Sequence, residues 1–198
     1  IIDRVVRANS KSGSQKNIFA HYDVGNEFYQ LRLEETMMYS SGIYNDPGDD
    51  LTATQYRKND RALSRLTDKE GILEIGCGWG GFAERAADQG RHVTGITVSK
   101  AQRSYADARL DGRADVQLRD YRDVKGKFDN IVSIEMIEAV GQRYWPSYFG
   151  AIKQTLGEGG RALLQAITVA DDRFDYYAKG SDYIRHHAFP GGLVISSA

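Results

Sequence analysis

A glycine-rich turn between two patterned segments is the feature that most constrains this chain. Residues 72–82 read ILEIGCGWGGF, an apolar run that leads directly into glycines and then into a segment of helical character, 82–89. Gly76, Gly78 and Gly81 fit the pattern G-x-G-x-x-G. Missing side chains let the backbone turn sharply and approach a nucleotide, while the free N–H groups of the following helix favour negative charge. The pattern predicts a strand, a ligand-binding loop and a helix, without identifying the ligand.

Alternating strands and helices after residue 71 predict the fold class. The expected elements are a strand at 91–97, a helix at 99–110, strands at 116–118 and 129–134, a helix at 145–156, a turn at 157–160 and a strand at 161–169. Ser99 is the expected N-cap of the first of these helices. Strands separated by helices favour a parallel sheet with right-handed crossovers, which is a doubly wound α/β fold. Ligands in such folds bind at the carboxyl ends of the strands.

The residues before 71 do not show this alternation of strands and helices. We expect one amphipathic helix at 51–66, with Tyr56, Leu63 and Leu66 in its apolar stripe. The charged residues expected outside that stripe are Arg57, Lys58, Asp60 and Arg65. The aromatic-rich residues 21–44 fit either packing or ligand contact. Residues 1–20 fit either a solvated connector or a basic arm on an anionic surface such as lipid headgroups.

Composition narrows the function classes. With 198 residues and 41% hydrophobic content, the chain predicts a single domain. Lys+Arg 26 against Asp+Glu 27 gives a net charge of -1, which does not favour nucleic acid as a partner. The single cysteine cannot form an internal disulfide, and no apolar run approaches the roughly 18–20 residues of a spanning helix. These observations predict a cytoplasmic protein.

The end of the second expected strand discriminates between nucleotide cofactors. An NAD site favours an acidic residue there, whereas residues 96–99 read ITVS. Glu74 precedes Gly76 by two, and E-x-G-x-G is typical of S-adenosylmethionine sites. Asp120 and Tyr121, just after the third expected strand, can supply a polar contact and an aromatic face for adenine, although Asp120 also fits an ordinary cap.

Several segments together carry a resemblance to a known family. They are HYDVGNEF (21–28), MYSS (38–41), LEIGCGWGG (73–81), GITVSKAQ (95–102), IVSI (131–134) with Glu138 and Gly141, and FPGG (189–192). Spread over residues 17–192, they resemble the cyclopropane-fatty-acyl-phospholipid synthase family, which includes the mycolic acid cyclopropane synthases and uses S-adenosylmethionine. The resemblance implies a methyltransferase that adds a methyl(ene) carbon to the cis double bond of an acyl chain in a phospholipid.

The resemblance also implies an architecture. It is the Rossmann-like class I methyltransferase fold, a doubly wound, mostly parallel sheet, all within one domain spanning 1–198. An N-terminal helical cap would occupy 1–70, the cofactor-binding core 71–170, and a helical insertion over the acyl site 171–198. The family pattern has two further strands after Gly192, of which residues 193–195 give a hint, so the C-terminal strands are expected to be missing.

The site residues implied by the resemblance fall into two groups. Together with Glu74, the cofactor-binding set is Tyr39, Ser40, Gly76, Gly78, Ile96, Thr97, Gln102, Asp120, Tyr121 and Ile134. In the family, a bound bicarbonate takes the final proton, held by a cysteine, a glutamate, a histidine, a backbone group and a late tyrosine. The corresponding positions here are Ser41, Glu138, Gln165 and Ile167, and no tyrosine matches the last.

Because Ser41 and Gln165 differ from the family's residues, the sequence fits more than one product and more than one catalytic acid. With Ser41 and Gln165 in place of cysteine and histidine, both a cyclopropane and a methyl- or methylene-branched chain fit. Glu135 is either a second candidate acid or a strand-end residue that faces the cofactor or solvent. Two other functions stay open: a non-catalytic or incomplete homologue that binds cofactor or lipid, and a methyltransferase that acts on a non-lipid substrate.

The expected partners follow from the substrate. They are the unsaturated acyl chain of a phospholipid, a membrane surface contacted peripherally, and a second copy of the chain in a homodimer. The aromatic and basic residues of 171–187 suit contact with that surface. We expect no metal site, because the adjacent His186 and His187 lack further ligands nearby in the sequence.

Overall fold

One parallel sheet organises the computed structural model, which describes residues 9–11, 13, 25–180 and 192–197. Its strands are β1 (Gly71–Ile75), β2 (His92–Thr97), β3 (Asp115–Leu118), β4 (Phe128–Ile134) and β5 (Leu156–Gln165). They lie in the order β3-β2-β1-β4-β5, with each neighbouring pair parallel. The predictions for residues 21–24, for His186 and His187 and for most of the basic arm lie outside the described residues; Lys11, within them, forms an ion pair with Asp123.

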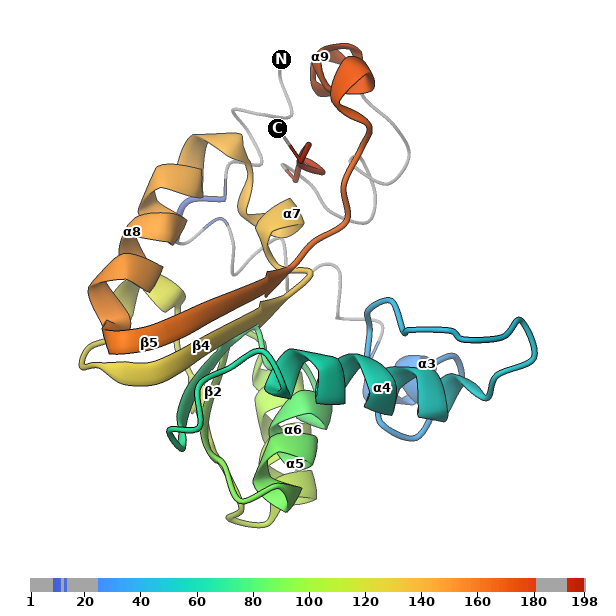
Figure 1. The fold of residues 1–198 in the computed structure, drawn as a ribbon, viewed down its shortest axis with the longest axis vertical. Coiled ribbons are helices and arrows are strands. Elements are labelled where there is room, and N and C mark those ends of the chain that lie inside the picture. Colours follow the sequence, from blue (N-terminus) through green and yellow to red (C-terminus); the bar gives the residue numbers. More distant parts are fainter. Residues whose placement is uncertain (1–8, 12, 14–24, 181–191, 198) are drawn as a thin grey trace.

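Helices cover both faces of this sheet (Figure 1). They are α3 (Asn26–Gln30), α4 (Leu51–Leu63), α5 (Gly81–Asp88), α6 (Lys100–Leu110), α7 (Ile137–Val140), α8 (Trp145–Thr155) and α9 (Asp171–Lys179), with short 3-10 turns η1 (Tyr121–Asp123) and η2 (Gln142–Tyr144). Helices α7 and α8 lie on one side, and α4, α5 and α6 on the other. The predicted doubly wound, parallel α/β fold is confirmed, with α3 and α4 as its N-terminal helical part.

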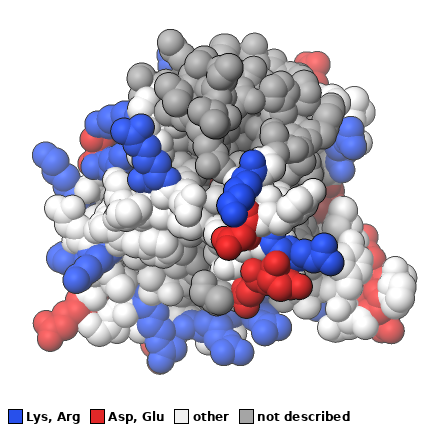
Figure 2. Space-filling view, turned by 90° about the horizontal axis from the view of Figure 1, so that it is seen from above, with Lys and Arg blue, Asp and Glu red and all other residues white. Residues whose placement is uncertain are grey.

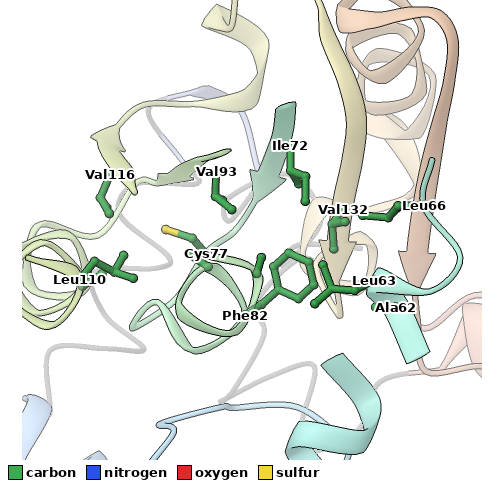
Figure 3. Close-up of a cluster of buried hydrophobic side chains, with 13 residues drawn as sticks. Ala62, Leu63, Leu66, Ile72, Cys77, Phe82, Val93, Leu110, Val116 and Val132 are labelled. Carbon is green, nitrogen blue, oxygen red and sulfur yellow. The ribbon is translucent and has the colours of Figure 1, made fainter. Parts of the chain in front are cut away.

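Two apolar clusters hold the layers together, one on each face of the sheet. Figure 3 shows the first, in which Phe82 of α5 packs with Leu63 of α4, Ile72 of β1 and Val132 of β4. Burying a side chain of this size stabilises the fold by about 1.5–3 kcal/mol. The buried Cys77 belongs to the same cluster and is a packing residue of the core.

The helix boundaries follow from local capping. Ser99 accepts a hydrogen bond from Gln102 N (3.2 Å) through its hydroxyl oxygen, so its predicted role as N-cap of α6 is confirmed. Asp50 does the same for α4, accepting from Ala53 N at 3.1 Å. Each cap satisfies a backbone N–H group that the first helical turn leaves without a partner.

The position of Lys58 differs from the prediction. Lys58 is buried, with 2% of its surface exposed, instead of lying on the solvent face of α4. Its Nζ donates to Ser40 Oγ (2.6 Å) and to Gln55 Oε1 (2.5 Å). Helical periodicity assigns a charged residue to solvent, but here Ser40, from outside the helix, lies against that side of α4 and supplies a polar partner.

The fifth strand also differs from the prediction. It begins at Leu156 and includes residues 157–160, where we expected a turn, and it ends at Gln165 instead of 169. Its pairing with β4 is irregular between Phe128 and Asn130. Leu156 pairs with Phe128 and Arg161 pairs with Asn130, so residues 157–160 form an irregular part of the strand, in which Gly159 has a φ of +68°. Farther along, Thr168 forms an isolated parallel bridge with Ile195.

Candidate functional site

A cavity of about 480 Å³ opens at the carboxyl edge of the sheet, where the ligand was expected. Most of the predicted site residues line it: Tyr39, Ser40, Glu74, Gly76, Gly78, Ile96, Thr97, Gln102, Ile134, Glu138 and Ile167. The four that lie outside the lining are Ser41, Asp120, Tyr121 and Gln165. The cavity therefore joins the glycine loop, the N-terminal residues 37–40 and the segment that follows β4.

The glycine loop presents bare backbone to this cavity. Gly76 N and Cys77 N both donate to Ile96 O, at 2.9 and 3.0 Å, which ties the loop to β2. Gly76 and Gly78 have φ values of +82° and +53°, in the left-handed region that glycine adopts without strain. A Cβ at Gly76 would lie 2.4 Å from Met136 Cγ, whereas a Cβ at Gly78 would project into open space. A ligand can therefore approach the backbone closely at Gly78.

A buried carboxylate lies beside the loop. Glu74, one residue before the end of β1, is 4% exposed, and its Oε2 has no hydrogen-bond partner. Burial raises the pKa of Glu74 to about 8, although the positive charge of Lys58 opposes this in part. Burial likewise lowers the pKa of Lys58 to about 8, against the attraction of Glu135, Glu34 and Glu74. An unpartnered buried acid lining a cavity is suited to a ligand that carries a positively charged donor, such as an ammonium group.

The end of β2 supplies uncharged polar groups. Thr97 Oγ1 donates to Gln102 Oε1 (2.9 Å) and accepts from Ser99 N (3.2 Å). This pair of bonds fixes the orientation of the buried Gln102 amide at the cavity wall. Arg119 also lines the cavity and was not predicted, because no pattern in the sequence marks it. Its backbone N–H donates to Thr97 O at 2.9 Å.

Asp120 and Tyr121 have other contacts. The Asp120 carboxylate accepts from Arg122 N (3.0 Å), Nε (2.7 Å) and Nη2 (2.6 Å), and it caps the η1 turn. This is the capping role that the sequence left open for Asp120. The Tyr121 ring packs edge-on against Tyr148, with centroids 5.3 Å apart. Both residues are therefore engaged in holding the loop after β3.

Two acids, Glu138 and Glu135, follow β4 at the other end of the cavity. Glu138 Oε1 accepts from Ile167 N, so the predicted acid and the predicted backbone group are in direct contact. Glu138 Oε2 is buried without a hydrogen-bond partner. Burial raises the pKa of Glu138, the hydrogen bond from Ile167 N opposes that rise, and the nearby charge of Glu135 adds to it.

Glu135, not Glu138, accepts hydrogen bonds from the predicted site residues Ser41 and Gln165. Its Oε1 accepts from Ser41 N (2.9 Å) and from Gln165 Nε2 (3.0 Å). Gln165 Nε2 also donates to Ser41 O (3.3 Å), and Glu135 N donates to Gln165 O (2.8 Å). The three residues therefore form one hydrogen-bonded group, which we call the Glu135 cluster.

Aromatic and apolar side chains complete the cavity wall. Trp79 lines it from within the glycine loop, and its ring packs on Tyr29 with centroids 4.8 Å apart. Trp79 Nε1 donates to Asn26 Oδ1 (2.9 Å), which ties α3 to the loop. Trp79 was missed as a lining residue, although its place among the glycines was a signal. Within the described ranges, no group of three His, Cys, Asp or Glu side chains is arranged to hold a metal ion.

Comparison with known proteins shows which family this chain resembles in sequence. The family model described as mycolic acid cyclopropane synthetase matches residues 9–198. The chain is 39% identical over 203 residues to the tuberculostearic acid methyltransferase UfaA1 of Mycobacterium tuberculosis, covering 96% of this chain and 48% of that protein. It is 34% identical over 180 residues to the cyclopropane-fatty-acyl-phospholipid synthase of Escherichia coli K12, covering 89% of this chain and 46% of that enzyme. The chain thus spans about half the length of these relatives.

Solved structures agree with the sequence relatives. The cyclopropane synthase MmaA2 of Mycobacterium tuberculosis superposes with a TM-score of 0.82 at 27% identity, covering 92% of this chain and 70% of that one. The mycolic acid cyclopropane synthase CmaA1, in a complex with SAH and CTAB, gives a TM-score of 0.81 at 28% identity with the same coverage. With the family match over residues 9–198, these findings show that the chain belongs to the mycolic acid cyclopropane synthetase family.

Proposed function

We propose that this chain is the methyl-transferring part of an S-adenosylmethionine-dependent enzyme that adds a methyl(ene) carbon to the cis double bond of a phospholipid acyl chain. The observation that carries the proposal is the single cavity in which the glycine loop and Glu74 lie at one end and Glu138 lies at the other. The names of the relatives, a tuberculostearic acid methyltransferase and a cyclopropane-fatty-acyl-phospholipid synthase, support the same chemistry.

The first end of the cavity suits the cofactor. S-adenosylmethionine, when bound, supplies an electrophilic methyl group on a sulfonium. Glu74, which lines the cavity and has an oxygen without a hydrogen-bond partner, is suited to accept from the ammonium of its amino acid head. Ser40, backed by the Lys58 ammonium, is placed to donate to a carboxylate. The bare backbone at Gly78 admits the nucleoside, and Thr97 and Gln102 offer it uncharged polar groups.

The other end suits an alkene. An alkene is a weak nucleophile, so most of the work is to hold it in line with the methyl group. The cavity wall also includes Leu33, Met37, Met38 and Phe82, apolar residues that exclude water from a cation formed on the chain. The Glu138 carboxylate contributes negative charge there, in a position where low polarity strengthens its effect. Loss of a proton from that cation then gives either a ring or a branched chain.

Contact with a membrane surface is part of the proposal, because the substrate resides there. Helix α9 carries Tyr176, which is 83% exposed, and none of its residues is buried. Seen from above, Lys and Arg side chains are spread around the rim of the described surface, with Asp and Glu among them (Figure 2). In the part of the chain that the structure describes, no helix has the length and apolarity needed to span a bilayer. We therefore propose a peripheral contact, to be tested by vesicle flotation.

The proposed function is tested with methyl-labelled S-adenosylmethionine and the full-length protein. Vesicles of a cis-unsaturated phospholipid are compared with vesicles of its saturated counterpart. We expect label in the unsaturated lipid alone, and mass spectrometry of fragmented acyl chains then distinguishes ring from branch. Cofactor binding without label in either lipid would refute the proposal, and label in an added water-soluble acceptor would redirect it to a non-lipid substrate.

A further inference from the structure

The Glu135 cluster occupies the position where the family resemblance implies a bound bicarbonate. That anion would need hydrogen-bond donors from the positions of Ser41, Gln165 and Ile167. Ser41 N and Gln165 Nε2 already donate to Glu135 Oε1, at 2.9 and 3.0 Å. Ile167 N donates to Glu138 Oε1. The carboxylates of Glu135 and Glu138 therefore already accept hydrogen bonds from these donors.

Charge also disfavours an added anion at this place. The carboxylates of Glu135 and Glu138 interact, and the charge of Glu135 contributes to the raised pKa of Glu138. A bicarbonate ion between them would meet two like charges in a partly buried setting. The nearby cation is Lys58, and among the charged groups that attract it Glu135 makes the largest contribution. The positive charge nearest to hand is thus already attracted by a carboxylate that the chain itself supplies.

The backbone at Glu135 points to a constraint on this side chain. Its φ is +50°, in the left-handed region that a non-glycine residue adopts at a cost. Glycine would occupy this position without strain, and such strain persists where the surroundings over-determine it, often at functional sites. Here the surroundings are the bonds of the Glu135 cluster, with Glu135 N on Gln165 O and its carboxylate on Gln165 Nε2. Glu135 also lines the cavity in which the acyl chain is proposed to bind.

We propose that Glu135 replaces bicarbonate as the proton acceptor, so that the enzyme works without added bicarbonate. This inference rests on the proposed function. The alkene electron pair forms the new C–C bond as the S–CH₃ bond breaks, and sulfur keeps that bonding pair. The cation on the acyl chain then loses a proton from carbon to the Glu135 carboxylate. The C–H electron pair closes the ring or forms a new double bond, which leaves a neutral product and a protonated Glu135.

The first test uses the wild-type protein and needs no variant. Label transfer to unsaturated phospholipid is measured in buffer purged of carbon dioxide, with and without added sodium bicarbonate. We expect the same turnover in both. Turnover that depends on bicarbonate would overturn this inference alone, because transfer itself would still support the proposed function. A wild-type protein that transfers no label would overturn both.

The second test removes the carboxylate. Glu135→Gly leaves a backbone that φ +50° suits and opens the space that the side chain filled. We expect turnover to fall about 10²-fold, the usual contribution of a positioned base. Because the freed donors of Ser41 and Gln165 can then hold a small anion, formate or bicarbonate should restore much of the turnover.

Matched variants separate this role from a structural one. Glu135→Gln keeps the size of the side chain, so we expect a similar loss that formate does not rescue. Glu158→Gln, an exposed acid near the opposite end of β5, should leave turnover unchanged. Thermal melting of each variant reports folding. A folded Glu135→Gly protein that keeps full turnover, or that neither anion rescues, would contradict the proposal.

Discussion

The two ends of the cavity differ in the chemical groups that line them. At the end near β1 and β2, the ligand would meet backbone, a few oriented polar groups and the buried acid Glu74, with positive φ at Gly76 and Gly78. At the end near β4 and β5, it would meet the side chains of Glu135 and Glu138, whose oxygens accept hydrogen bonds from neighbouring segments. Backbone can position a ligand, but it offers no group that takes a proton at neutral pH.

This difference predicts a division of labour. Changes at the glycine end should alter the binding of cofactor, whereas changes at the carboxylate end should alter turnover at unchanged cofactor affinity. The experiments below test that division, in order of decreasing expected effect.

Glu138→Gln should have the largest effect. It removes the negative charge beside the reacting chain while keeping the size of the side chain, and we expect turnover to fall about 10²–10³-fold. Binding of S-adenosylhomocysteine, measured by calorimetry, should stay unchanged, with Glu158→Gln as a surface control. Undiminished turnover would remove Glu138 from the mechanism, and a large loss of affinity would break the proposed division.

Glu74→Gln tests the buried charge at the glycine end through the pH dependence of stability. Because the pKa of Glu74 is raised to about 8 in the folded protein, its contribution to the free energy of unfolding is greatest below about pH 4.5 and is lost as the pH rises through 8. Gln mimics the protonated acid at every pH. We expect the variant to match wild type at pH 5 and to exceed its stability by about 2–4 kcal/mol at pH 8.

Urea unfolding at the two pH values measures this difference. Glu158→Gln, at an exposed residue outside the cavity lining, is the surface control. A Glu74→Gln effect that does not change between pH 5 and pH 8 would show that Glu74 titrates normally in the folded protein.

Gly78→Val should weaken cofactor binding by at least about tenfold. The substitution strains a backbone with φ of +53° at a cost of about 1–2 kcal/mol and places a branched side chain in the cavity. Gly126→Val is the matched control, since Gly126 also has positive φ, +96°, but is exposed and lies outside the cavity lining. Equal S-adenosylhomocysteine affinity in both variants would mean that the ligand does not approach the loop at Gly78.

Cys77→Ala should have the smallest effect. The Cys77 side chain packs in the core cluster of Figure 3, and burial raises the pKa of its thiol well above the ordinary value. We expect a loss of about 1 kcal/mol in the free energy of unfolding and no change in turnover. In the folded wild type, alkylation by iodoacetamide should be slow, and rapid alkylation would contradict this packing role.

Sequence reasoning recovered the parts of the molecule that local patterns encode. The parallel strands, the glycine loop and the Ser99 cap follow from periodicity, glycine spacing and a hydroxyl at a helix start. The buried position of Lys58 could not be predicted in this way, because it depends on Ser40 folding back over α4.

The Glu135 cluster lay further beyond the reach of such patterns. Ser41 and Glu135 are 94 positions apart, and Ser41 and Gln165 are 124 apart, so no local spacing relates them. Family resemblance named Ser41 and Gln165 as site positions, but it linked them to Glu138. Their contact with Glu135 follows from how residues 38–41 lie across the ends of β4 and β5.

An experimental structure with bound S-adenosylhomocysteine would test the central claim most directly. The account predicts that the ligand's amino acid head lies between Glu74 and Ser40, and that its sulfur faces the end of the cavity that holds Glu135 and Glu138. A ligand bound outside this cavity, or one whose sulfur points away from both carboxylates, would contradict the proposed division between the glycine end and the carboxylate end.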